Sequence, residues 1–487
     1  MDQEQAFLED IAEHPDDDTP RLIYADWLDD QGKTERAEWI RLQCAMSQMD
    51  LDDPRMNELQ DRMLVLQNLE TKWLGPLVAH LQSYTFSRGL LNGVSILPEV
   101  FAEQAARLFR HGPVSQVHTV LASPSDAQRF FFCDGLQRIR TLGVHAARPT
   151  LLDELWNCDR LPWLQQLDLN GSGLGPEGLQ LLAKAPFAGQ LRSLHLGNNR
   201  IGLTGIEVLC SAASLQQLHH LDVQNNRLGS VGLQALGTSS GLPQLRTLNL
   251  SHNEISATGV RGLARRQQFT HLVEFALSGN PLGDNGLSAL ADSRAFPALQ
   301  TLHLRATRLA SQAGQALASA TWMSTLRVLN LDDNHLGSAG AISLGRAPAS
   351  GQFQALYLSN NQIGDEGAEG LARWDAIPTL RYLYLTDNNL TAFGVKHLVK
   401  RLTGNRLREL HLQQNRLGDL GAQVLARWPG FAALTSLNLE GNAIGNEGAL
   451  ALLRSPHLSP HCELMLDIDD LDLAIQQKIE SRHSIPV

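Results

Sequence analysis

Residues 407–421 read LRELHLQQNRLGDLG, and this stretch decides the fold. Its spelling, L-x-x-L-x-L-x-x-N-x-L-G-x-x-G, returns with small changes every 27 residues. The first position of each copy is occupied by Leu164, Leu191, Leu218, Leu245, Leu272, Leu299, Leu326, Phe353, Leu380, Leu407 and Leu434. A fixed period over this many copies indicates a repeat array, in which each repeat buries its apolar face against its neighbours.

One repeat contains a strand, a turn and a helix. The L-x-L stretch alternates with period 2, which predicts a short strand with one buried face. The segment after it, such as 418–426, spaces its apolar residues for a helix that packs back on the strand. An asparagine at the ninth position has an amide that both donates and accepts, so we expect stacked copies to satisfy the buried backbone of the turn. Thr307 interrupts this series and predicts a weak point there.

Glycine follows the first leucine by fourteen positions in almost every repeat, and Ala313 replaces it in the sixth. A residue without Cβ is predicted to let the start of the helix approach the strand closely. Taken together, the pattern predicts an α/β solenoid: a curved horseshoe with parallel strands on the concave face and helices outside.

The period also divides the chain. We predict an acidic helical domain over residues 1–50, a helical bridge over 51–90, and degenerate repeats over 91–163. Eleven regular repeats follow over 164–460, with a cap and tail over 461–487. Residues 1–80 carry 19 Asp and Glu against 7 Lys and Arg, a charge of −12, so nearly all of the net charge of −11 lies at the front. Within the front we expect helices over 3–13, 21–30, from Thr34 onward, and over 55–73.

Two family resemblances follow from these motifs. The 27-residue unit resembles leucine-rich repeats of the ribonuclease-inhibitor type over residues 91–475. Residues 15–30, PDDDTPRLIYADWLDD, together with Gly32 and residues 36–43, resemble the bacterial repeat-companion domain. The second resemblance implies a bacterial origin and supplies no mechanism. The first implies a binding role, with a regulatory inhibitor or a GTPase activator as the alternative.

Composition restricts the remaining classes. The array lacks the basic excess that phosphate backbones require, which argues against nucleic acid. No segment approaches the apolar length of a bilayer span, and no secretory signal is visible at the N-terminus. Five scattered cysteines without a C-x-x-C pair are typical of reduced thiols, so we expect a cytoplasmic protein. The motifs indicate no cofactor and no metal.

Candidate binding residues lie at the outward positions of the predicted strands. Three of the five tyrosines, Tyr357, Tyr382 and Tyr384, fall on two adjacent repeats, with His411 on the next. Clustered exposed aromatics are typical of protein-binding hot spots, although tyrosine also favours strands for its own sake. The predicted partner-binding set is Tyr357, Tyr382, Tyr384, His411, Arg305 and His303.

Two acidic clusters suggest chemistry but have simpler explanations. Asp168, His195 and Asp222 occupy equivalent outward positions and resemble a fragment of a catalytic site, although no nucleophile or oxyanion donor accompanies them. The run Asp16-Asp17-Asp18 lacks the spacing of a calcium loop and is better explained as helix capping. We therefore predict a non-catalytic scaffold that binds an unknown protein or peptide on its concave face, and an enzyme only as the less favoured alternative.

Overall fold

The computed structural model describes residues 3–49, 55–239, 241–265, 269–403 and 406–483. The chain divides into two compact units. Unit 1 comprises Met1–Asn199 with Ala212–Leu218, and unit 2 comprises Arg200–Ser211 with His219–Val487. Each unit is an α/β solenoid segment built from strand, turn and helix repeats, as the 27-residue period predicted.

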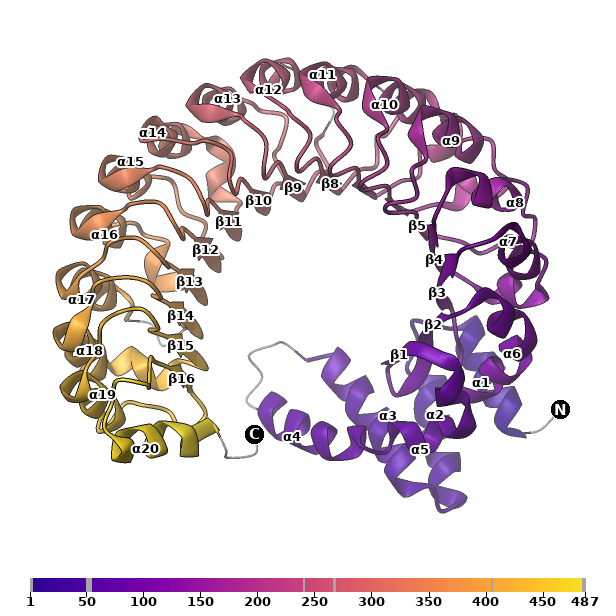
Figure 1. Ribbon diagram of the computed structural model, residues 1–487, viewed down its shortest axis with the longest axis horizontal. Coiled ribbons are helices and arrows are strands. Elements are labelled where there is room, and N and C mark those ends of the chain that lie inside the picture. The colour runs from indigo at the N-terminus through magenta and orange to yellow at the C-terminus, as the bar shows by residue number, and fades with distance from the viewer. Residues whose placement is uncertain (1–2, 50–54, 240, 266–268, 404–405, 484–487) are drawn as a thin grey trace. The chain divides into compact units, whose positions relative to one another are not determined.

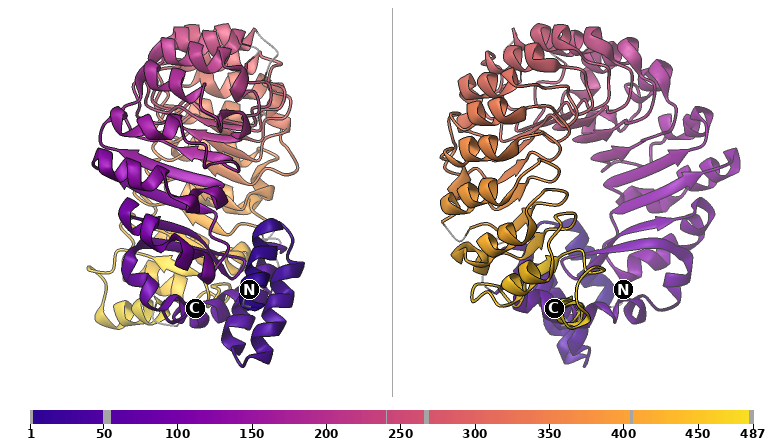
Figure 2. Two further views of the ribbon diagram at one scale, coloured as in Figure 1. Left: turned by 90° about the vertical axis from the view of Figure 1, so that its right-hand side faces the viewer. Right: turned by 60° about the vertical axis from the view of Figure 1, so that its left-hand side comes forward.

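The front of unit 1 is all helical. Its helices are α1 (Gln3–Glu13), α2 (Thr19–Asp30), α3 (Thr34–Ser47), α4 (Met56–Gln67) and α5 (Glu70–Leu74). The helix predicted over 55–73 is thus divided in two. Figure 2 shows these helices, coloured indigo to violet, beside the first strands of the same unit.

The front helices share one core with the first repeats. Leu8, Tyr24 and Ile40 pack with Leu90, the first residue of β2. Gly89, in the turn before β2, has a φ of +83°, and a Cβ there would lie 2.3 Å from the Cα of Ile40. Only glycine fits such a turn against a helix. The acidic front is therefore docked onto the array and not attached by a free linker.

Six strands make up the sheet of unit 1: β1 (Leu81–Ser87), β2 (Leu90–Ile96), β3 (Gln116–Leu121), β4 (Thr141–Ala146), β5 (Gln166–Asp168) and β6 (Ser193–His195). β1 and β2 form an antiparallel hairpin, and the following pairs are parallel. Residues 81–87, expected within a helical bridge, are therefore a strand. The helices of these repeats are α6 (Pro98–His111), α7 (Pro124–Phe131), α8 (Asp153–Trp156) and α9 (Gly175–Leu182).

The described residues of unit 2 form ten short parallel strands: β7 (His220–Asp222), β8 (Thr247–Asn249), β9 (Glu274–Ala276), β10 (Thr301–His303), β11 (Val328–Asn330), β12 (Ala355–Tyr357), β13 (Tyr382–Tyr384), β14 (Glu409–His411), β15 (Ser436–Asn438) and β16 (Glu463–Met465). Its helices are α10 (Gly202–Ser211), α11 (Gly229–Thr238), α12 (Ala257–Ala264), α13 (Gly283–Ala291), α14 (Gln312–Ser319), α15 (Gly337–Leu344), α16 (Gly364–Ala372), α17 (Ala392–Arg401), α18 (Gly418–Ala426), α19 (Asn446–Leu453) and α20 (Leu473–His483). Within this unit the strands lie on the inner, concave side and the helices on the outer side (Figure 1).

The ninth-position asparagines form a buried ladder. Asn253 is fully buried, and its amide nitrogen donates to the carbonyls of Val223 and Leu250. Its side-chain oxygen accepts from the backbone N–H groups of Asn226 and Leu228 in the preceding repeat. Because each amide serves its own turn and the previous one, the ladder couples neighbouring repeats.

Thr307 keeps only part of this ladder. Its hydroxyl donates to the carbonyl of Leu304, and its backbone N–H donates to the side-chain oxygen of Asn334. Within the described residues its side chain makes no hydrogen bond to the preceding turn, where the N–H of Leu282 bonds instead to the carbonyl of Asn280 at 2.8 Å. The ladder is therefore interrupted toward the preceding repeat, and a loss of stability there stays a prediction.

The repeated glycine serves a different contact from the one predicted. A Cβ at Gly367 would lie 2.6 Å from the side chain of Ile363 and 3.0 Å from the Cα of Ser338. Ser338 belongs to α15, so the missing side chain lets neighbouring helices approach each other and is not needed for the strand.

Three tryptophans of unit 2 close the return from helix to strand. Trp322, Trp374 and Trp428 are buried, and each indole N–H donates to a backbone carbonyl of an earlier repeat. Among the helices of the described residues, none is long and apolar enough to span a bilayer.

Candidate partner-binding surface

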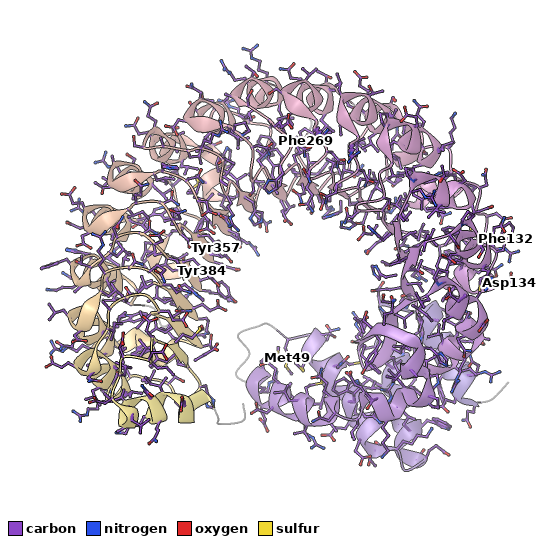
Figure 3. All side chains as sticks on the ribbon, viewed as in Figure 1. Met49, Phe132, Asp134, Phe269, Tyr357 and Tyr384 are labelled. Atoms are coloured by element: carbon purple, nitrogen blue, oxygen red, sulfur yellow. The ribbon has the colours of Figure 1, made fainter. Side chains whose placement is uncertain are left out.

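Strand register brings three predicted residues into line. Tyr357 of β12 pairs with Tyr384 of β13, which pairs with His411 of β14. The rings of Tyr357 and Tyr384 stack with centroids 4.6 Å apart and an interplanar angle of 27°. Tyr384 and His411 stack at 4.2 Å and 5°. We call these three residues the aromatic column, and Figure 3 shows its two tyrosines side by side on the inner side of the strands.

Glu409 contacts two members of the aromatic column, Tyr384 and His411. The Tyr384 hydroxyl donates a 2.5 Å hydrogen bond to Oε2 of Glu409, and Nε2 of His411 lies 3.4 Å from the same oxygen. Burial raises the pKa of Tyr384, and the hydrogen bond to this carboxylate raises it further. The phenol therefore stays protonated and keeps donating at neutral pH.

Tyr382 lies beside the aromatic column and not in it. It occupies the first position of β13, in register with Ala355 and Glu409. Its side chain is half-buried and close enough to raise the pKa of Tyr384. The patch predicted from three tyrosines and a neighbouring histidine is thus two tyrosines and the histidine in a stack, with the third tyrosine alongside.

The remaining two predicted residues lie outside the aromatic column. Nε2 of His303, on β10, is 3.7 Å from Oε1 of Glu274, and this neighbouring imidazole lowers the pKa of that carboxyl. Nε of Arg305 lies 2.6 Å from Oδ2 of Asp333. The structure therefore ties Arg305 to the turn after β11, and neither residue stacks on the rings.

Two carboxylates near the aromatic column were missing from the predicted set. The first is Glu409, which contacts both Tyr384 and His411, as described. Asp332 follows β11, and its Oδ1 accepts a 2.6 Å hydrogen bond from the N–H of Ser359. Burial raises the pKa of Asp332. The sequence did contain a signal for them, because Glu409 is at the third position and Asp332 at the seventh position of its repeat.

The resemblance to a catalytic fragment has a structural explanation. The side chain of Asp168 accepts a hydrogen bond from the N–H of Asn170, and Asp222 accepts one from Gln224. Asn330 caps Asp332 in the same way. Asp or Asn at this position thus stabilises the turn after its own strand. His195 Nε2 lies 3.0 Å from the hydroxyl of Ser193.

In the front domain, Asp17 accepts a hydrogen bond from the N–H of Thr19, the first residue of α2. This backbone hydrogen bond lowers the pKa of Asp17. Asp18 lies 3.2 Å from Arg88. In the acidic run, Asp17 therefore stabilises the turn that leads into α2, and Asp18 pairs with the β1–β2 turn.

Ten segments of the chain match the family model described as Leucine Rich repeat. They are residues 160–183, 191–210, 214–237, 242–264, 270–291, 323–345, 353–372, 376–399, 406–426 and 433–453. This is a leucine-rich-repeat protein. The leucine-rich repeat that begins at Leu299, which contains Thr307 and Ala313, lies between two matched segments and is not itself matched.

Solved leucine-rich-repeat structures are similar at low identity. An internalin from Listeria monocytogenes is 21% identical, with 66% of this chain and 86% of that chain covered and a TM-score of 0.42. The ectodomain of the Arabidopsis receptor kinase HAESA, solved with a peptide hormone, is 18% identical over 82% and 65%, with a TM-score of 0.38. Rad7, in the yeast Rad7 and Elc1 complex, is 15% identical over 94% and 97%, with a TM-score of 0.45. No curated protein matches the sequence.

Proposed function

We propose that this leucine-rich-repeat protein binds a protein or peptide partner on the concave strand face of unit 2, without catalysis. The observation that carries the proposal is the aromatic column of Tyr357, Tyr384 and His411. Its rings are partly exposed, stacked and held by backbone register. Preordered aromatic side chains lose little conformational entropy on binding and are enriched among hot-spot residues.

The surroundings of the aromatic column have the polarity of a binding rim. Tyr382 extends the aromatic area along β13, and the ion pair of Arg305 with Asp333 lies toward β10. An aromatic centre with a polar, solvated rim is the usual arrangement of a protein interface. We include His303 in this rim.

A binding role is favoured over catalysis because the polar residues that could suggest catalysis have structural hydrogen bonds. The aspartates that resembled a catalytic fragment each cap a turn, and Asp17 of the acidic run stabilises the turn before α2. A phosphate backbone is disfavoured as the partner because carboxylates border the aromatic column.

Selection of a random dodecamer library displayed on phage tests this proposal. Selected peptides are measured by fluorescence anisotropy against the full chain and against Tyr384→Ala. We expect the substitution to weaken binding at least tenfold, about 1.4 kcal/mol. Thr247→Ala, at an outward position of β8, is the matched control and is expected to leave affinity unchanged. Melting temperatures confirm that both variants fold. Peptides that bind Tyr384→Ala as tightly as the wild-type chain would place the binding surface elsewhere.

We further propose that the repeats are of the ribonuclease-inhibitor type, that the front helices are a bacterial repeat-companion domain, and that the protein is cytoplasmic. A 27-residue period with a helix in the repeats supports the first. The thiols at positions 44, 133, 158 and 210, which no disulfide joins in the described residues, support a reducing compartment.

A further inference from the structure

Charge is distributed unevenly along the concave face of unit 2. We consider the third, fifth, seventh and eighth positions of the six repeats from β11 to β16, which run from Val328 to Ile468. These positions carry no lysine or arginine and seven carboxylates, a formal charge of −7: Asp332, Asp333, Asp387, Glu409, Glu440, Glu463 and Asp467. We call these positions the acidic strip.

The acidic strip begins abruptly. The same positions in the four preceding repeats of unit 2, from β7 to β10, carry Asp222, Glu274 and Arg305, a formal charge of −1. All three are already engaged: Asp222 caps its turn, Glu274 contacts His303, and Arg305 pairs with Asp333 of the acidic strip. The aromatic column therefore lies in the acidic half of the face and not at its neutral end.

Two carboxylates of the acidic strip lie near Tyr357: Asp332 accepts a hydrogen bond from the N–H of Ser359, and Glu409 accepts one from Tyr384, the stacking neighbour of Tyr357. Burial raises the pKa of Tyr357, and the charges of Glu409 and Asp332 raise it further, so both carboxylates act on this ring. Asp332 is itself destabilised in its charged form by burial. Carboxylates that are partly removed from water gain more from a partner's cation than fully solvated ones do.

Among the described residues, no second ring stacks on Tyr357 at the β11 end of the aromatic column. Tyr357 has Tyr384 as its stacking neighbour, and the strand on its other side, β11, presents Asn330 in register with it. Asp332 lies two residues further along that chain segment. A planar guanidinium can stack on a ring face and pair with a carboxylate at the same time, which an ammonium does less well.

We propose that the partner of the concave face is a peptide segment that carries arginine, and that its guanidinium docks at the Tyr357 end of the aromatic column within the acidic strip. This proposal rests on the proposed function and names the chemistry of the partner. Charge complementarity selects a cationic peptide over a membrane surface or a nucleic acid, both of which present phosphates. The acidic strip steers such a segment to the column, and the rings fix its position.

The test uses the phage selection described above, on the full chain. We expect arginine to be enriched among selected peptides relative to the unselected library. Each selected peptide is then synthesised twice, once with arginine and once with citrulline, which has the same shape and no charge. Binding to the wild-type chain is expected to fall at least tenfold with citrulline.

Protein variants locate the effect. Glu409→Gln and Asp332→Asn keep hydrogen-bond acceptors for Tyr384 and Ser359 but remove one charge each. We expect each to weaken the arginine peptide severalfold and the citrulline peptide hardly at all. Glu447→Gln, an exposed position on α19, removes the same charge from the helical side and is expected to change neither affinity.

The outcomes separate the two proposals. Peptides that require Tyr384 but show no arginine enrichment, or that bind equally with citrulline, overturn the cationic partner and leave the binding surface intact. The loss of affinity on replacing arginine by citrulline is compared between the wild-type chain and the two variants. An equal loss in the wild-type chain, in Glu409→Gln and in Asp332→Asn overturns the assigned dock. Peptides that ignore Tyr384→Ala overturn the proposed function itself.

Discussion

Replacing one rung of the asparagine ladder, Asn388→Ala, tests the reasoning that underlies the fold. Asn388 is fully buried, and its amide nitrogen donates to the carbonyls of Leu358 at 2.8 Å and Thr386 at 3.1 Å. Its side-chain oxygen accepts from the N–H groups of Asn361 at 3.1 Å and Ile363 at 3.2 Å. The substitution removes all four hydrogen bonds.

The two N–H donors determine the cost. A buried donor without a partner costs about 1–3 kcal/mol, whereas a carbonyl with a second lone pair loses less. Two donors at about 2 kcal/mol each give an expected loss of roughly 4 kcal/mol in the free energy of unfolding. Threonine at this position is expected to lose less, because Thr307 keeps a hydrogen bond to the carbonyl of Leu304 and the N–H of Leu282 in the preceding turn finds the carbonyl of Asn280 as another acceptor.

Urea denaturation measures the global change, and hydrogen exchange followed by mass spectrometry localises it. We expect the amides of Asn361 and Ile363 to exchange faster in Asn388→Ala, and less so in Asn388→Thr. Asn157→Ala, at an exposed helix end, is the control and should cost under about 0.5 kcal/mol. Unchanged protection of the two amides, with an unchanged urea midpoint, would refute the ladder as a source of stability.

Two further predictions concern ionisation and packing. The raised pKa of Tyr384 means that the folded chain holds the phenolic proton more tightly than the unfolded chain, in which tyrosine ionises near pH ~10. The resulting contribution to the free energy of unfolding is complete below that pH and is lost as the pH rises through the folded pKa. The urea midpoint should therefore fall less steeply at alkaline pH in Tyr384→Phe than in the wild-type chain. An identical fall in both proteins would contradict this prediction. Gly367→Ala should cost about 1–3 kcal/mol by crowding α15, whereas Gly351→Ala, which meets open space, should leave thermal unfolding nearly unchanged. Equal melting temperatures for these two variants would show that helix approach is not limiting.

Most of the regular array was predictable because one physical rule repeats. The alternation around Leu383 and Leu410 predicts strands with one buried face, and the structure places both leucines in the core of β13 and β14. The asparagine positions followed from the need to satisfy a buried turn. Strands β2 to β4 lie in the irregular repeats, where the pattern is weaker.

The hairpin at the front was not predictable by the same rule. Strand β1 has no leucine register, and its residues alternate between half-buried and exposed, because it pairs antiparallel with β2 and covers the start of the sheet. The role of the glycines was also misassigned. Sequence spacing shows that a small residue is required at Gly367, but only coordinates show that the close neighbour is Ser338 of the preceding helix.

For the binding surface, the sequence predicted positions and not contacts. Equal spacing placed Tyr357, Tyr384 and His411 on adjacent strands, and the structure adds the stacking of their rings. The hydrogen bond from Tyr384 to Glu409 depends on side-chain rotamers, which no repeat pattern encodes. The contribution of these residues to binding stays a prediction.

The asparagine ladder also determines the order in which the repeats can be completed during synthesis. The turn after each strand is completed by an amide that lies 25 to 27 residues further along the chain, as for Asn361 and Ile363 with Asn388. A ribosome releases every turn before the residue that completes it has been made. The newest coil of a growing chain therefore always has open donors, and folding trails synthesis by one full repeat. Shortening the array from its C-terminal side exposes the same donors.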